Sequence, residues 1–225
     1  RLAEAAAEAK RKGSATTYAA EAERVLLALK VCDAAVGSGH FLIAAAHRLA
    51  QRLARVRTGD EEPSPEAYRA ALRDVITHCL YGVDVNPMAV ELCKVSLWLE
   101  AMVPGKPLGF LDAHIQCGNS LVGILDPAVL ADGIPDEAYV ALTSDDKDAV
   151  KQLKKRNSLG RSVLQGELFG AAATPEPQLC SADVDTLPED TVDQVEAKRQ
   201  AWERLREGYF FFNDRVISEI YTAAF

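Results

Sequence analysis

The sequence predicts an α/β fold built on a doubly wound parallel sheet, and three observations support this prediction. Three short apolar segments end at, or just before, an acidic or amide residue, and helical segments separate them. The first apolar segment continues into a glycine loop and then a helix, which is how a doubly wound sheet begins. Of the 225 residues, 48% are hydrophobic and 26% are charged, as in an ordinary globular protein with a buried core.

Three predicted strands, with helices between them, make up the first half of the chain. Residues 30–33 are expected to end a buried strand, residues 34–39 are small enough for a tight loop, and residues 41–56 repeat apolar side chains at the helical period. The other expected elements are a helix before residue 29, a helix at 66–77, a strand at 80–85, a helix from Pro87 to residue 102 and a strand at 114–117.

The second half of the chain lacks this alternation of strands and helices. The segment 171–190 is rich in Pro, Ala, Thr and acids, and we expect it to be a mobile loop. We expect a sheet-forming domain at residues 1–125 and a mainly helical insertion at residues 126–225. The helices expected in this insertion lie at 145–156, 191–207 and 213–224.

Three polar residues stand at the ends of the three predicted strands: Asp33, Asp84 and Asn119. A glycine loop such as the one with Gly37 and Gly39 lets backbone N–H groups approach a ligand closely, and the helix that follows favours negative charge. An acidic side chain at a strand end can accept hydrogen bonds from ribose hydroxyls, and an amide can both donate to and accept from an adenine edge. Each residue alone also suits a structural role, as a turn or a helix cap. Together, at successive strand ends, they predict a ligand site at the carboxyl edge of the sheet.

The residues around these positions resemble motifs of adenine-specific DNA methyltransferases. The segment V-C-D-A-A-V-G-S-G-H-F-L is similar to the family motif D-P-A-C-G-S-G-x-F-L. The segment Y-G-V-D-V-N-P-M-A-V-E-L-C-K-V-S-L-W-L-E resembles the next motif of the large type II and IIG restriction-modification methylases, and P-L-G-F-L-D-A-H-I-Q-C-G-N-S-L-V-G resembles the segment that follows. The resemblance is dense over residues 26–125, and the ending N-D-R-V-I-S-E-I-Y-T-A-A-F is similar more loosely to the helix before the catalytic motif.

The resemblance implies a Rossmann-like core that binds S-adenosylmethionine, within an enzyme that methylates the adenine amino group of DNA in a restriction-modification or phage-defence system. Because Phe is commonly buried, we expect Phe41 to anchor its helix in the core rather than to contact a ligand. Ala34 and Val36 replace the Pro and Cys of the family loop, and both keep it small and apolar. The implied cofactor-binding residues are Asp33, Ala35, Gly37 and Gly39 around the methionine part, Asp84 at the ribose hydroxyls, Pro87 and Met88 beside the adenine, and Asn119 at the adenine's polar edge.

The family's catalytic motif, [N/D/S]-P-P-[Y/F/W], is absent, since the 225 residues contain no Pro-Pro pair. In the family, this motif accepts hydrogen bonds from the amino group, and its aromatic ring stacks on the flipped base. An upstream aromatic-Thr-Pro segment is also degraded, to Thr16-Thr17-Tyr18-Ala19. We therefore name no catalytic residue. We expect the chain, which begins at Arg1 and not at Met, to be part of a larger methyltransferase or restriction polypeptide and to be inactive alone.

The net charge of −8 bears on the expected DNA partner, because proteins that contact many phosphates usually present a basic surface. Either DNA is not a partner, or the DNA-binding surface lies largely outside this chain. The basic stretch at residues 147–156 suits a phosphate contact or a solvated helix face. Two other functions stay open: a non-catalytic cofactor-binding subunit or pseudoenzyme remnant, and a dinucleotide-binding oxidoreductase.

The sequence also contains no pattern that predicts a membrane-spanning helix or a metal site. No run of about 18 apolar residues is present, as a membrane-spanning helix would need. The five cysteines have no C-x-x-C spacing, and the four histidines share no spacing typical of metal ligands. We expect a cytoplasmic protein whose thiols are buried and reduced.

Overall fold

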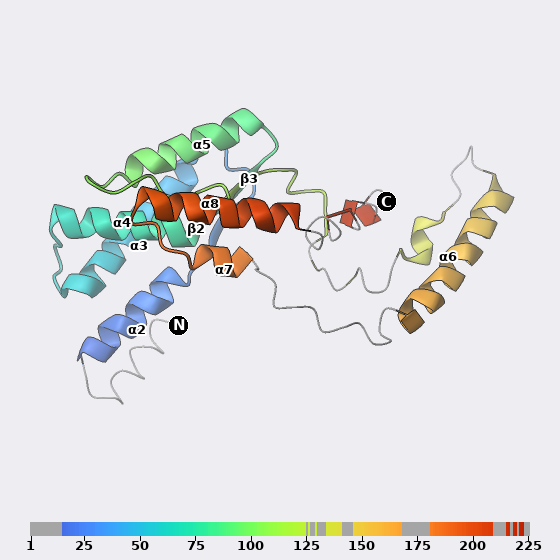
Figure 1. Cartoon of the computed structure of the whole chain (residues 1–225), viewed down its shortest axis with the longest axis horizontal. Coiled ribbons are helices and arrows are strands. Elements are labelled where there is room, and N and C mark those ends of the chain that lie inside the picture. The colour runs from blue at the N-terminus through green and yellow to red at the C-terminus, as the bar shows by residue number, and fades with distance from the viewer. Residues whose placement is uncertain are drawn as a thin grey trace. The chain divides into compact units, whose positions relative to one another are not determined.

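The computed structural model describes two compact units of the chain (Figure 1). The described residues are 15–124, 126, 129, 134–140, 146–167, 181–208, 215, 216, 218, 219, 221 and 222. The first unit comprises Arg1–Ser120 and Ser181–Glu203, and the second comprises Leu121–Cys180 and Arg204–Phe225. The chain therefore leaves the first unit after residue 120 and returns to it at residue 181, which differs from the single division after residue 125 that we expected.

The first unit is built around a parallel sheet of three strands in the order β1-β2-β3. Strands β1 (Val31–Asp33), β2 (Leu80–Asp84) and β3 (Ile115–Cys117) each lie within the range predicted from the sequence. Asp33 pairs with Gly82, and Asp84 pairs with Cys117. Because the strands are parallel, their carboxyl ends lie at one edge of the sheet, and the predicted α/β architecture is confirmed in this form.

Four helices accompany these strands: α2 (Ala15–Leu27), α3 (His40–Thr58), α4 (Pro65–Cys79) and α5 (Pro87–Glu100). Local sequence explains where two of them begin. Ser64 caps α4 by accepting a hydrogen bond from the N–H of Ala67, and Asn86 caps α5 by accepting one from the N–H of Met88. Both helices begin with proline, which suits the first turn of a helix.

The apolar core lies between one face of the sheet and the helices α3, α4 and α5. Alanine at several buried positions of α3 lets the backbones of α3 and α4 approach closely. On the strand side, a Cβ atom at Gly82 would lie 2.8 Å from Cγ2 of Val36, so glycine is needed here for the loop after β1 to pack on β2. The buried residues of the two helices include Leu42, Ala46, Ala50, Leu53 and Ala54 on α3, and Ala71, Leu72, Val75 and Ile76 on α4.

The returning segment, residues 181–203, makes polar contacts with the rest of the first unit and also buries Val184, Ala201 and Trp202. It contains α7 (Ser181–Asp185) and most of α8 (Val192–Glu207). Lys198 Nζ donates to Glu189 Oε1 at 2.6 Å, and both side chains are buried. From α4, Arg73 donates to the carbonyl oxygen of Glu189 at 3.0 Å. The Arg73 contact attaches the segment to α4, whereas the Lys198–Glu189 pair joins two parts of the segment itself.

The structure corrects the expectation of a mobile loop at residues 171–190 for the part that it describes. Residues 181–185 are helical, and Glu189 is buried among cations; residues 171–180 lie outside the described residues. The physical reason is that the partners of this segment are distant in the sequence. Arg73 stands 116 positions from Glu189, and His114 stands 71 positions from Asp185, so no local pattern reveals them.

Of the second unit, the structure describes chiefly η2 (Asp136–Ala138) and α6 (Lys147–Glu167). The side-chain amide of Asn157 donates to the carbonyl oxygen of Ile134 at 2.9 Å, which joins α6 to the segment before η2. Helix α6 carries the basic stretch and extends beyond the helix predicted at 145–156. The helix expected at 213–224 lies largely outside the described residues. In the described part of the chain, no helix is both long and apolar enough to cross a membrane.

Candidate functional site

The glycine loop connects β1 to α3 and needs glycine at two positions. Gly37 and Gly39 have φ angles of 54° and 88°, which side chains other than glycine rarely adopt. A Cβ atom at Gly39 would also lie 2.9 Å from Sγ of Cys93 on α5, so the loop approaches α5 more closely than a side chain allows. At the start of the loop, Asp33 Oδ1 accepts a hydrogen bond from the N–H of Ala35 at 3.0 Å.

Asp84 connects the glycine loop to the other two strand ends. Its Oδ2 accepts a hydrogen bond from the N–H of Gly37 at 2.9 Å, and its Oδ1 accepts one from the N–H of Asn86 at 2.8 Å. Its carbonyl oxygen accepts a third from the N–H of Gly118, just after β3, at 2.9 Å. The N–H groups of Asn86 and Gly37 lower the pKa of the Asp84 carboxyl, because they stabilise its charged form. Asp84 is therefore an ionised acceptor at the centre of the carboxyl edge.

Helix α3 begins at the same edge and has no side chain that caps its amino end. Gly39 occupies the N-cap position without a side-chain hydrogen bond, and the first turn contains no acidic residue. The first N–H groups of an α-helix have no partner within the helix, and the helix dipole favours negative charge there. This end of α3 is suited to a carboxylate or another anion.

Exposed apolar side chains lie beside these polar groups. Met88 is 73% exposed and Val85 72% exposed, and both follow β2. Phe41 is 60% exposed, which corrects the expectation that it anchors α3 in the core. The reason is helical phase: Leu42 occupies the buried side of the first turn, and its neighbour Phe41 therefore faces outward. A ligand with both apolar and polar parts fits this combination.

The structure brings the predicted site residues to one edge of the sheet. Asp33, Ala35, Gly37 and Gly39 lie in or next to the loop that bonds to Asp84; Pro87 and Met88 begin α5; and Asn119 directly follows Gly118. Within the described residues, no three His, Cys, Asp or Glu side chains are grouped as ligands of a metal ion.

Two residues support the glycine loop in ways that the sequence analysis missed. Cys93 lies beneath Gly39, and Val36 is buried against Gly82 with its N–H donating to the carbonyl oxygen of Val83 at 2.9 Å. The helical spacing of Cys93 with the buried residues Val90 and Leu97 was the available signal for its inward position. No local pattern indicated the role of Val36.

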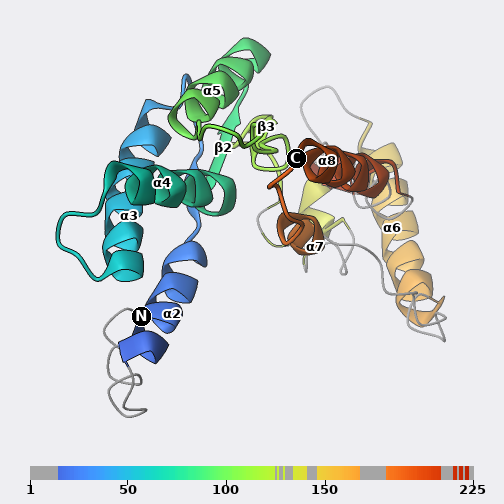
Figure 2. The same ribbon diagram turned by 60° about the vertical axis from the view of Figure 1, so that its left-hand side comes forward.

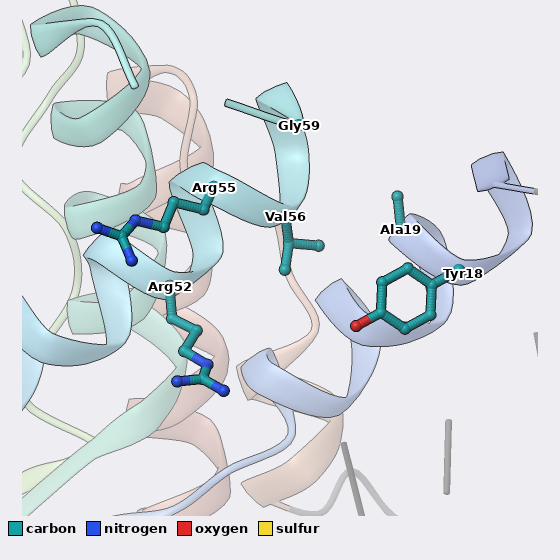
Figure 3. A pocket seen from close by; sticks show the side chains of 6 residues that line it. All are labelled: Tyr18, Ala19, Arg52, Arg55, Val56 and Gly59. Atoms are coloured by element: carbon teal, nitrogen blue, oxygen red, sulfur yellow. The ribbon is translucent and has the colours of Figure 1, made fainter. Parts of the chain in front are cut away.

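A pocket between α2 and α3 lies away from this edge (Figure 3). Arg52 of this pocket comes 13 residues after Gly39 on α3, a distance of roughly 20 Å along a helix. Tyr18 and Ala19 belong to the degraded upstream segment named above, so the structure places these two residues far from the glycine loop. The lining residues are Tyr18, Ala19, Arg52, Arg55, Val56 and Gly59.

Two known proteins resemble part of this chain. RM.MjaORFECS2P of Methanocaldococcus jannaschii, named as a type II restriction enzyme and methyltransferase, is 39% identical over 107 residues, which are 44% of this chain and 9% of that protein. PglX of Streptomyces coelicolor, named as an adenine-specific methyltransferase, is 34% identical over 105 residues, which are 42% of this chain and 8% of that protein. The chain thus matches a small part of the length of these relatives, and the similarity supports a methyltransferase family. No family model and no solved structure matches the chain.

We predict that Gly39→Ala destabilises the protein more than Gly59→Ala. Both glycines have positive φ, so both substitutions introduce backbone strain. Only the Cβ at position 39 meets a neighbour, at 2.9 Å, whereas none lies within 4 Å of a Cβ at position 59. Urea denaturation should give a loss of about 2–4 kcal/mol for Gly39→Ala and about 1 kcal/mol for Gly59→Ala. Equal losses would contradict the close approach of the loop to α5.

We also predict that the Asp84 carboxyl titrates below its ordinary pKa of 3.8. A lowered pKa in the folded state means that Asp84 contributes stability above its ordinary pKa, and that this contribution is lost as the pH falls through the lowered value. Carbon-13 NMR titration of the side-chain carboxyl groups, assigned with Asp84→Asn, measures this pKa. A value above 3.8 would show that the two backbone hydrogen bonds do not hold the charged form.

Proposed function

We propose that the first unit is the S-adenosylmethionine-binding part of a DNA methyltransferase that acts on the adenine amino group in a restriction-modification system, with a Rossmann-like core. The observation that carries this proposal is the ionised Asp84 carboxylate, bonded to the glycine loop and to the start of α5 at one edge of a parallel sheet. Ligands of open α/β sheets bind at this edge, outside the carboxyl ends of the strands.

In this proposal, Asp84 accepts hydrogen bonds from the two ribose hydroxyls. Each of its carboxylate oxygens already accepts one backbone N–H, and each has a second lone pair for a ligand hydroxyl. An Asp carboxyl is charged at neutral pH, the two backbone hydrogen bonds lower its pKa further, and hydrogen bonds to a charged acceptor are stronger than those to a neutral one. A ribose cis-diol has the two donors that such an acceptor needs.

The glycine loop and the start of α3 frame the methionine part of the cofactor. The carboxylate of the methionine part matches the uncapped amino end of α3 after Gly39, and its ammonium group matches the Asp33 carboxylate. Ala35 and Gly37 keep the loop free of bulk, so that the backbone can approach the ligand. These assignments extend the residues named from the family resemblance.

The adenine part of the cofactor is proposed to lie on the apolar surface that follows β2. Pro87 and Met88 offer apolar contact, and the thioether of Met88 suits an aromatic ring. Val85 extends the same exposed surface. Asn119, which follows β3, is proposed to meet the polar edge of the adenine because its amide both donates and accepts.

S-adenosylmethionine would supply an electrophilic methyl group, and the residues of this chain bind and orient it. Transfer to an amino nitrogen depends mainly on holding donor and acceptor in line. The motif that holds the acceptor amino group in the family, [N/D/S]-P-P-[Y/F/W], is not among the 225 residues. We therefore propose that this chain completes only the cofactor half of the reaction. DNA and the remainder of a larger methyltransferase or restriction polypeptide are its proposed partners, and the names of the two relatives support both.

We predict that calorimetry detects binding of S-adenosylmethionine to this chain and that Asp84→Ala weakens it by about tenfold to a hundredfold, because the ribose hydroxyls lose their acceptor. Asp60→Ala is the matched control, since it removes an exposed carboxylate just beyond the opposite end of α3 and should leave the affinity unchanged.

Three results would redirect this proposal. Tight binding of NAD without binding of S-adenosylmethionine would favour a dinucleotide-binding oxidoreductase. Incorporation of labelled methyl groups into DNA adenine by the purified chain would show that transfer does not need the missing motif. Co-purification with a separate protein that contains the motif would favour a non-catalytic, cofactor-binding subunit.

A further inference from the structure

We propose that Asp185, from the segment that follows the insertion, is a positioning residue for the cofactor site and acts through Tyr81 on β2 and His114 at the start of β3. This inference rests on the proposed function, because it concerns the strands whose ends carry Asp84 and Asn119. It adds to the site a residue that lies about 100 positions beyond Asp84 in the chain.

The carboxylate of Asp185 bridges two neighbouring strands with one oxygen on each. Tyr81 Oη donates to Asp185 Oδ2 at 3.1 Å, and His114 Nε2 lies 2.9 Å from Asp185 Oδ1. The rings of Tyr81 and His114 stack, with centroids 4.2 Å apart and planes at 30°. Lys30, just before β1, donates to Tyr81 Oη at 2.6 Å. This Asp185 cluster (Lys30, Tyr81, His114 and Asp185) therefore touches the amino-terminal end of all three strands.

The strands that the cluster holds lead directly to the cofactor edge. Tyr81 comes three residues before Asp84, and His114 comes three residues before Cys117, a span of about 10 Å along a strand. A backbone hydrogen bond also joins the two strands here, since the N–H of Gly82 donates to the carbonyl oxygen of His114 at 3.0 Å. With five residues in β2 and three in β3, the ladder supplies few hydrogen bonds. Side-chain contacts at the amino-terminal ends of such short strands therefore limit movement of their carboxyl ends.

Asp185 reaches the face of the sheet that α3 and α4 leave uncovered. Side chains alternate between the two faces of a strand, and Gly82 packs toward Val36 and Leu42, so Tyr81 points to the opposite face. Figure 2 shows α3 and α4 on one side of β2 and β3 and α7 on the other, and Asp185 is the last residue of α7. The apolar core and the Asp185 cluster thus hold the sheet from opposite sides.

The charges and burial of the cluster explain why Asp185 is not easily replaced. His114 is 4% exposed, and among the described residues its Nδ1 has no hydrogen-bond partner. The other ring nitrogen, Nε2, has Asp185 as its hydrogen-bond partner. Burial acts to raise the pKa of Asp185, but His114, Tyr81 and Lys30 outweigh it, and the pKa lies below the ordinary value. Without this carboxylate, a buried imidazole and a half-buried phenol would both lack an acceptor.

The returning segment has other anchors, so the Asp185 side chain can be tested without releasing it. From α4, Arg73 donates to the carbonyl oxygen of Glu189 at 3.0 Å, and within the segment Lys198 Nζ donates to the carbonyl oxygen of Asp185 at 3.3 Å and to Glu189 Oε1. Glu189 Oε2 accepts a hydrogen bond from the N–H of Phe110 at 3.1 Å. None of these contacts uses the Asp185 carboxylate, so α7 should stay in place in Asp185→Ala.

The test combines hydrogen exchange measured by mass spectrometry with calorimetry of S-adenosylmethionine binding. In Asp185→Ala we expect exchange to rise about tenfold in residues 82–86 and 115–120, and the dissociation constant to rise about tenfold. Exchange in the core helix α4, which reports global unfolding, should stay unchanged. Asp185→Asn keeps one acceptor oxygen for the two partners, so its exchange and affinity should lie between those of the wild type and Asp185→Ala; unchanged exchange in α4 distinguishes this local effect from a general loss of stability.

Asp190→Ala is the matched control on the same segment. Asp190 pairs with Lys106 at 2.7 Å, is exposed and touches neither strand, so exchange at 82–86 and 115–120 and cofactor affinity should equal those of the wild type. If Asp185→Ala does not fold, Tyr81→Phe removes only the hydroxyl of the cluster and should still raise exchange at residues 82–86.

The outcomes separate this inference from the proposed function. Unchanged exchange at residues 82–86 and 115–120 in a folded Asp185→Ala, or in Tyr81→Phe, would overturn the positioning role even if the cofactor binds. A wild-type chain that does not bind S-adenosylmethionine would overturn the proposed function, whereas the exchange experiment would still decide whether Asp185 orders the two strand ends.

Discussion

The arrangement of the carboxyl edge depends on the hydrogen bonds that Asp84 accepts. It accepts the backbone N–H groups of Gly37 and Asn86, and the carbonyl oxygen of the same residue accepts that of Gly118. The glycine loop, the start of α5 and the end of β3 are therefore bonded to one residue. Loss of the carboxylate would leave two backbone donors without their acceptor as well as removing the proposed ribose contact. Asp84 is therefore needed both for the order of this edge and for the proposed binding of the cofactor.

The two faces of the sheet are held by different kinds of interaction. One face packs against the alanine- and leucine-rich surface of α3 and α4, where close approach depends on small residues such as Gly82 and Ala46. The other face meets the returning segment through the contacts of Asp185 with Tyr81 on β2 and with His114 at the start of β3. Close apolar packing and buried hydrogen bonds both restrict shifts of a strand. On the polar face, Asp185 contacts residues of two neighbouring strands directly.

Local patterns were sufficient to predict the three strands and the helices between them. Alternation of apolar segments with polar strand ends located β1, β2 and β3, helical periodicity located α3 and α4, and the first-turn proline Pro87 marked the start of α5. The same patterns placed Asp33, Asp84 and Asn119 at one edge, because parallel strands present their carboxyl ends together. What these residues bind is a proposal that rests on the motifs, the similarity to two methyltransferases and the geometry of Asp84.

Long-range contacts could not be predicted from the sequence. The composition of residues 171–190 indicated a loop, yet Asp185 has a partner at β3, 71 positions away, and Glu189 has one in α4, 116 positions away. Phe41 illustrates a second limit: a one-residue difference in helical phase decides whether it or Leu42 fills the core. The direct bond between Asp84 and the N–H of Gly37 likewise depends on how the loop after β1 folds onto β2.

The most direct test of the central claim is a crystal structure of this chain with S-adenosylhomocysteine, the product form of the proposed cofactor. We predict that both ribose hydroxyls lie within hydrogen-bonding distance of the Asp84 carboxylate, with the homocysteine part against the loop from Asp33 to Gly39. A ligand bound elsewhere, for example in the pocket beside Tyr18 and Arg52, or one whose ribose does not contact Asp84, would contradict the account.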